Sequence, residues 1–162
     1  MLRSAEALFL GFHFNKIDVK GRIAAPADYR RALDLKAFNG FYCAPSLVGP
    51  YLDCGGGGWI LGLQSMIAAL DPYDPDRAAL EAALIGRSRP VPLDGDGRFI
   101  LPQTLRDHAR LDDRVFFIGH GETFEIRSAD GAEEQMNEAA ERARGALAKL
   151  KNPPRPLPAE GA

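Results

Sequence analysis

Apolar and polar residues alternate with a period close to two along several short segments of this chain. Alternation of this kind is typical of β-strands that bury one face. It predicts strands at 9–17, 23–25, 41–43, 50–52, 99–101, 115–118 and 123–127. Asn39-Gly40 and His120-Gly121 are turn signals. The pattern therefore indicates several short strands joined by tight turns.

Longer segments carry apolar residues three or four positions apart, which predicts helices. The expected helices cover 59–70, 76–86 and 132–150, and two shorter helices follow Pro26 and Pro102. Asp74-Pro75 has the cap-then-proline order of a helix start. We expect the proline-rich residues 152–162 to form a disordered or extended tail. These elements predict a mixed α/β (α+β) fold with a C-terminal helix.

Residues 17–30 and 93–106 resemble one another at an offset of 76. Five of the 14 aligned positions are identical, where typical residue frequencies give about one. The identical pairs are Asp18/Asp94, Gly21/Gly97, Arg22/Arg98, Pro26/Pro102 and Arg30/Arg106. Carried downstream, the same offset aligns Phe41 with Phe117. We interpret the pattern as an internal duplication.

The repeated unit has the form D-x-x-G-R followed by a short apolar run. An Asp at the start of a turn accepts backbone N–H bonds, and Gly adopts a positive φ without steric cost. The unit therefore predicts a tight strand–turn–strand corner in which the Arg lies beside the Asp. A solvated hairpin turn with a local ion pair would have the same pattern, but both copies keep both charges.

With these two spaced copies, the chain resembles the MraZ family. Further matching stretches are 9–11, 15–18, 83–86, 117–119 and 124–126. The resemblance covers about residues 9–147 and departs at Arg127, where the family commonly carries Trp. It implies two SpoVT/AbrB-type swapped-hairpin repeats, at 9–54 and 91–128, that form a duplicated β-barrel-like core. A helical connector at 55–90, a C-terminal helix at 129–151 and a tail at 152–162 would complete the chain.

The resemblance also implies a function. Similar proteins are bacterial transcriptional regulators that form closed rings and bind tandem short repeats upstream of their own division and cell-wall gene cluster. The implied partners are double-stranded promoter DNA and further copies of this chain, in the cytoplasm at the nucleoid. No cofactor, metal, membrane or small-molecule substrate is implied, and no enzymatic activity.

Charge is nearly balanced, with 20 Lys and Arg against 22 Asp and Glu and a formal net charge of −2. This balance by itself argues mildly against a nucleic-acid partner. Basic residues nevertheless outnumber acidic ones by five to two between Lys16 and Arg31. A ring would repeat this local basic segment and so multiply its effective concentration on DNA.

The first candidate for a DNA contact is Arg22, with Lys20 beside it, because Arg reads guanine or grips phosphate and Lys grips phosphate. Arg98 is the matching residue in the second copy, where Asp96 replaces Lys20. We therefore expect the first copy to dominate. The remaining basic candidates are Lys16, Arg30 and Arg31, and the residues expected to fix the turns are Asp18, Gly21, Asp94 and Gly97.

Other chemistries find little support in the sequence. Cys43 and Cys54 are the only cysteines and read as buried free thiols, although a disulfide is also compatible with them. The run Gly55–Gly58 lacks the Lys-Ser/Thr of a phosphate-binding loop and predicts a flexible turn before Trp59. Two alternatives remain: an oligomeric protein-interaction scaffold without DNA binding, and a small hydrolase with a pocket converging on His120 or His108.

Overall fold

A computed structural model describes residues 4–151 of the chain. The strands are β1 (Phe12–Lys16), β2 (Arg22–Ala24), β3 (Gly40–Pro45), β4 (Leu52–Gly55), β5 (Arg89–Pro92), β6 (Arg98–Ile100), β7 (Arg114–Gly119) and β8 (Thr123–Ser128). The helices are α1 (Ala27–Ala32), α2 (Gly57–Ala68), α3 (Pro75–Leu80), α4 (Gln103–His108) and α5 (Ala132–Ala146). Short 3-10 helices, η1 (Ala5–Ala7) and η3 (Leu147–Lys149), and a π-helical turn, η2 (Glu81–Ile85), complete the set. The predicted tail at 152–162 lies outside the described residues.

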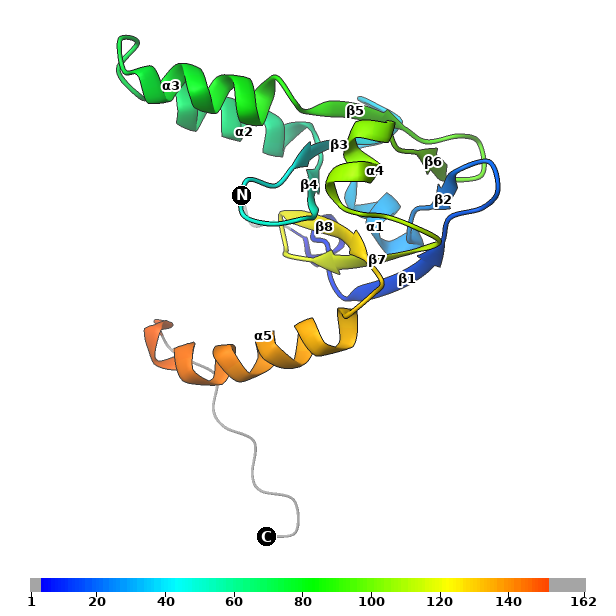
Figure 1. The fold of residues 1–162 in the computed structure, drawn as a ribbon. Helices are drawn as coiled ribbons and strands as arrows, with labels where there is room; N and C mark the ends of the chain where they lie inside the picture. The colour runs from blue at the N-terminus through cyan, green and yellow to red at the C-terminus, as the bar shows by residue number, and fades with distance from the viewer. Residues whose placement is uncertain (1–3, 152–162) are drawn as a thin grey trace, which may run out of the picture. The chain divides into compact units, whose positions relative to one another are not determined.

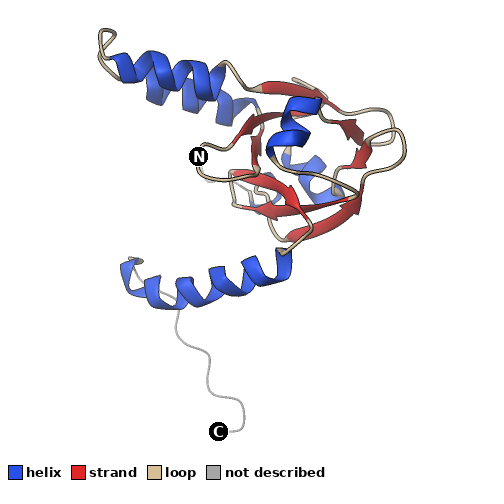
Figure 2. Ribbon diagram, viewed as in Figure 1, coloured by secondary structure: helices blue, strands red, loops and turns tan. Residues whose placement is uncertain are grey.

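The strands form two antiparallel sheets, as Figures 1 and 2 show. Six strands lie in the order β1-β7-β8-β4-β3-β5, and β2 pairs with β6 in a separate two-stranded ribbon. The described strands do not close into a barrel. The mixed α/β class, the duplicated core and the C-terminal helix agree with the fold predicted from the sequence.

The two repeats complete each other's strand pairing. β1 of the first repeat pairs with β7 of the second, and the equivalent β5 pairs with β3 of the first. The equivalent strands β2 and β6 pair directly, as do β4 and β8. The two strands of the predicted strand–turn–strand corner therefore do not form a hairpin: β1 and β2 share one isolated bridge, Ile17 with Ile23. This exchange is the swapped-hairpin arrangement.

The offset between the repeats is not constant. It is 76 for β2 and β6 and for α1 and α4, but the pairing registers make Phe41 of β3 equivalent to Val115 of β7. The alignment of Phe41 with Phe117 was therefore wrong. The physical reason is loop length, because 33–39 connects α1 to β3 whereas the shorter 109–113 connects α4 to β7.

An aromatic cluster fills the core between the two repeats. Tyr29, 1% exposed, packs edge-on against Phe9 with ring centroids 5.4 Å apart and lies 5.0 Å from Phe124. Cys43 and Cys54 face each other across β3 and β4 and are fully buried. They do not form a disulfide, and their sulfur atoms are 3.5 Å apart. The interpretation as buried free thiols is confirmed.

The four-glycine run is a compact strand-to-helix junction and not the flexible turn that we predicted. Gly55 ends β4, Gly56 caps α2, and the helix begins at Gly57, two residues before Trp59. A Cβ on Gly55 would lie 2.9 Å from the indole of Trp59. Glycine at this position therefore lets the Trp ring pack directly on the end of the strand.

The chain divides into two compact units, residues 1–129 and 130–162. The first unit contains both repeats and the connector helices. The described part of the second unit is α5 with η3, an alanine-rich helix with acidic Glu133 and Glu134 in its first turn. Within residues 4–151, no helix is both long and apolar enough to cross a membrane.

Candidate nucleic-acid interface

The first D-x-x-G-R turn is held by the carboxylate of Asp18. One oxygen, Oδ1, accepts the backbone N–H groups of Lys20 at 2.9 Å and Arg22 at 2.8 Å. The other, Oδ2, accepts from Nε of Arg22 at 2.7 Å. Gly21 closes the turn with its N–H on the Asp18 carbonyl at 2.9 Å and has a φ of +81°. The Asp18 carboxylate and the positive φ of Gly21 thus hold the backbone of this turn together.

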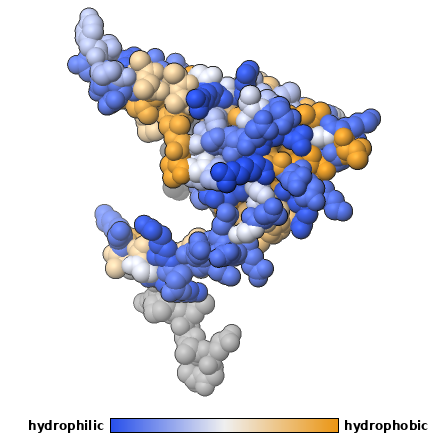
Figure 3. Space-filling view, viewed as in Figure 1, coloured by the Kyte–Doolittle hydropathy of each residue, from blue (hydrophilic) through white to orange (hydrophobic). Residues whose placement is uncertain are grey.

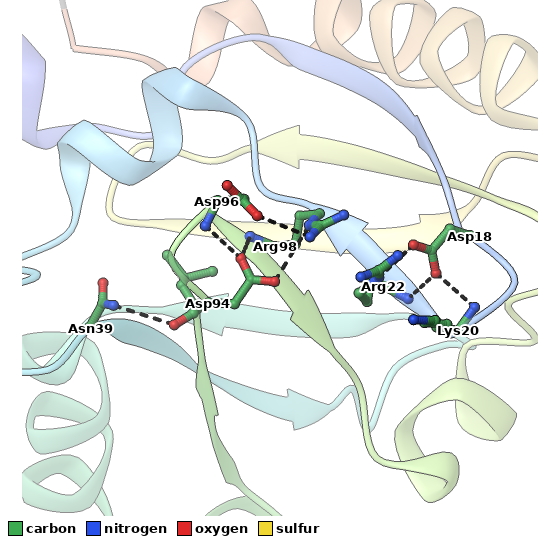
Figure 4. Close-up of polar contacts among 8 residues, drawn as sticks. Asp18, Lys20, Arg22, Asn39, Asp94, Asp96 and Arg98 are labelled. Carbon is green, nitrogen blue, oxygen red and sulfur yellow. Dashed lines mark hydrogen bonds and ion pairs between the residues drawn. The ribbon is translucent and has the colours of Figure 1, made fainter.

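The second turn repeats this geometry. Asp94 Oδ1 accepts the backbone N–H groups of Asp96 at 2.8 Å and Arg98 at 3.0 Å. Nε of Arg98 lies 3.4 Å from Asp94 Oδ2, and Gly97 adopts a φ of +75°. Figure 4 shows both turns, with dashed lines that join each Arg to the Asp of its own turn. The duplication thus preserves a complete turn motif in each repeat.

Both turn carboxyls have a pKa below the ordinary Asp value. The backbone N–H of Arg22 is the main cause for Asp18, because it stabilises the charged carboxylate, and desolvation acts in the opposite direction. The backbone N–H of Arg98 acts in the same way on the pKa of Asp94. Each Asp is therefore held as an anion that orients its turn and its arginine.

The two arginines share one exposed face of the β2–β6 ribbon. Arg22 lies opposite Ile100 and Ala24 lies opposite Arg98, so these four side chains project on the same side. Ile23 and Phe99, on the other side, are buried in the core. The arginines occupy diagonal positions, which are roughly 7–8 Å apart in an antiparallel pair. The ribbon thus presents a small face with a guanidinium at each end.

An arginine from each repeat also lies against the turn of the other repeat. A Cβ on Gly97 would lie 2.6 Å from Nη1 of Arg30, which comes from α1 of the first repeat. A Cβ on Gly21 would lie 3.3 Å from Nη1 of Arg106, which comes from α4 of the second. The positive φ of both glycines is the stronger requirement, and at Gly97 a side chain would also displace the guanidinium of Arg30.

The two turns differ in charge. In the first, Asp18 engages Nε of Arg22, and the described contacts leave both Nη groups for an external acceptor. In the second, Nη2 of Arg98 also donates to Asp96 at 3.1 Å. The residue at the Asp96 position in the first turn is Lys20, which is exposed. In the second turn the carboxylates of Asp94 and Asp96 therefore offset the charge of Arg98. The first turn carries an excess of positive charge.

Two other predicted basic residues, Lys16 and Arg31, lie outside the two turns. Lys16 is exposed at the end of β1, opposite Arg114 of β7 and two residues before Asp18. Arg31 forms an exposed ion pair with Asp28 on its own helix. Arg106 was not among the predicted basic residues, although its identity with Arg30 in the repeat alignment was a signal that could have pointed to its place against the first turn.

His108 and His120, the histidines proposed for a hydrolase, lie outside the two turns in the sequence. His120 Nε2 is 3.2 Å from Glu125 Oε2, across the β7–β8 hairpin. His108 Nε2 is 3.1 Å from the carbonyl of Gly49. Within the part of the chain that the structure describes, no three His, Cys, Asp or Glu side chains are grouped to hold a metal ion.

Comparison with known proteins gives one family. The family model described as "MraZ protein, putative antitoxin-like" matches residues 84–149. A protein of Methylocella silvestris named "Transcriptional regulator MraZ" is 35% identical over 136 residues, which cover 84% of this chain and 83% of that protein. A protein of the same name from Rickettsia felis is 36% identical over 145 residues, covering 90% and 97%. One from Rickettsia bellii is 43% identical over 112 residues, covering 69% and 75%.

Proposed function

The chain belongs to the MraZ family of transcriptional regulators, and on this premise we propose that it binds double-stranded DNA through the exposed face of the β2–β6 ribbon. The observation that carries the proposal is the placement of Arg22 and Arg98 on one exposed face. The major groove of B-DNA admits a two-stranded β-ribbon, and an arginine there can donate two hydrogen bonds to a guanine edge. The ribbon therefore has suitable dimensions and suitable donors.

Within this face, the first turn makes the stronger contact. Arg22 reads a base or grips a phosphate, and Lys20 binds the adjacent backbone as a point charge. Arg106 adds a third cation next to this turn, since its guanidinium lies against Gly21. Arg98 and Arg30 form the corresponding pair at the second turn, where Asp96 weakens phosphate binding. Asp18 and Asp94 aim the arginines and do not contact DNA.

We further propose that the protein acts as a ring-shaped homo-oligomer on tandem repeats upstream of its own division and cell-wall gene cluster, at the nucleoid. One subunit has a small basic face, so several faces must engage at once to bind tightly. Exposed aromatic side chains support self-association: Phe12 is 54% and Phe14 is 40% exposed on β1, an edge strand of the six-stranded sheet.

The test is binding to a labelled duplex that carries the gene's own upstream region, followed by fluorescence anisotropy at two salt concentrations. Arg22→Ala should weaken binding by about 1–3 kcal/mol and relax sequence preference, as expected for loss of a base contact. Arg142→Ala is the matched control, because Arg142 is an exposed arginine on α5. If the folded, oligomeric wild type does not bind at low salt, the protein-interaction scaffold becomes the better account.

A further inference from the structure

A cavity lies beside α4 of the second repeat. It has a volume of about 350 Å³ and lies between α4, the start of β5 and the residues after η2. Its lining consists of Pro45, Gly86, Arg87, Arg89, Thr104, Leu105 and His108. Cavities of roughly 300 Å³ and more are large enough for small-molecule ligands. The DNA-binding proposal uses none of these residues.

The internal duplication shows how a residue of this cavity's lining differs between the repeats. In the first repeat, Tyr29 occupies the position equivalent to Leu105. Its hydroxyl donates to the carbonyl of Gly11 at 2.8 Å, and its ring packs against His13 with centroids 5.2 Å apart. In the second repeat a shorter leucine replaces the tyrosine, and this leucine lines the cavity.

The same comparison explains the charge of the cavity. At the offset of 76, Arg87 replaces Gly11 and Arg89 replaces His13. Two arginines therefore border the cavity where the first repeat has a glycine and a histidine beside its packed tyrosine. Neither arginine forms an ion pair with another residue in 4–151, and no carboxylate lines the cavity.

Thr104 suits the same kind of ligand. Thr104 contributes a hydroxyl that can donate to an anion. His108 is held in place because its Nε2 donates to the Gly49 carbonyl, which can only accept. Guanidinium groups bind phosphate through paired, charge-assisted hydrogen bonds. We propose that this cavity is a binding site for a small molecule that bears a phosphate dianion, which makes it a ligand site separate from the DNA-binding ribbon.

The experiment is a titration of the full-length, isotope-labelled protein with inorganic phosphate and, in a second arm, with glycerol 2-phosphate, at constant ionic strength set with chloride. Backbone NMR shifts should change and saturate at residues 86–89 and 104–108. Tighter binding of the glycerol ester would identify an organic phosphate as the ligand, and equal binding would identify free phosphate. Shifts confined to the two D-x-x-G-R turns, or shifts that never saturate, would overturn the proposal.

Variants separate the cavity from the ribbon. Arg87→Ala and Arg89→Ala should each weaken phosphate binding by about tenfold, as expected for loss of a charge-assisted hydrogen bond. Leu105→Tyr, which restores the residue of the first repeat, should fill the cavity and abolish binding. Arg22→Ala should leave phosphate binding unchanged even though it weakens DNA binding. Wild-type phosphate affinity in the Arg87→Ala, Arg89→Ala double variant would refute the site, whatever the outcome for DNA.

Discussion

Exchange of one residue should make the second turn behave like the first. Asp96 is 78% exposed and pairs with Nη2 of Arg98 at 3.1 Å, whereas the first turn has Lys20 at the matching position. Asp96→Lys removes this pair, frees the guanidinium and adds a cation to the ribbon face. Because exposed ion pairs contribute about 0–1 kcal/mol, the variant should fold with nearly unchanged stability.

The size of the effect on DNA binding follows from counterion release. Each additional phosphate contact makes the slope of log K against log salt steeper by about 0.9. Raising the salt fourfold should therefore weaken the variant by an additional factor of about 3.5 for each new contact, relative to wild type. At low salt the variant should bind more tightly than wild type, since a repulsive carboxylate is replaced by an attractive ammonium group.

The assay is anisotropy with the upstream duplex at several salt concentrations. Asp96→Asn is the matched control: it frees the Arg98 guanidinium but supplies no new cation, so it should bind more tightly than wild type, with a slope less steep than that of Asp96→Lys. If Asp96→Lys has wild-type affinity at low salt and a wild-type slope, the second turn does not approach the DNA backbone, and the proposed composite face is wrong.

Two further predictions concern the turns themselves. Gly97→Ala should lower the free energy of unfolding, measured by urea titration, by at least about 1 kcal/mol. A side chain at positive φ is strained, and the new methyl would lie 2.6 Å from Nη1 of Arg30. Gly95→Ala is the control, because Gly95 has open space around it, and it should change stability by no more than about 0.5 kcal/mol. The lowered pKa of Asp18 and of Asp94 adds stability that is present above the unfolded pKa near 4 and is lost as pH falls from about 4 through the lower folded value. Denaturant titrations at a series of acidic pH values should show this loss in wild type and a smaller one in the double Asp→Asn variant, and equal losses would contradict it.

The local features were predictable because they depend on neighbours within a few residues. Asp18 and Gly21 determine the first turn through hydrogen bonds to residues no more than four positions away. The helices after Pro26 and Pro102 and the β7–β8 hairpin also follow from local signals. Pattern reasoning therefore identified the turns, most element positions and the residues of the first turn.

The non-local features were not predictable in this way. Alternation indicates that a strand has a buried face, but it does not indicate which strand pairs with it. The family resemblance implied an exchange between the repeats, and the structure shows that β1 and β5 are the exchanged strands. The approach of Arg30 to Gly97 depends on that exchange. The cavity beside Leu105 likewise depends on packing between residues that are distant in the sequence, such as Pro45 and Arg87.

The most direct test of the ribbon as the DNA-binding face is site-specific cross-linking. Cys43 and Cys54 are fully buried, so a thiol-reactive photo-cross-linker should label only an introduced surface cysteine. Ile100→Cys places the label on the ribbon face, where Ile100 is 56% exposed, and Leu61→Cys places it on α2, where Leu61 is 65% exposed. We predict cross-links to the upstream duplex from position 100 and none from position 61. Cross-links from position 61, with none from position 100, would contradict the account.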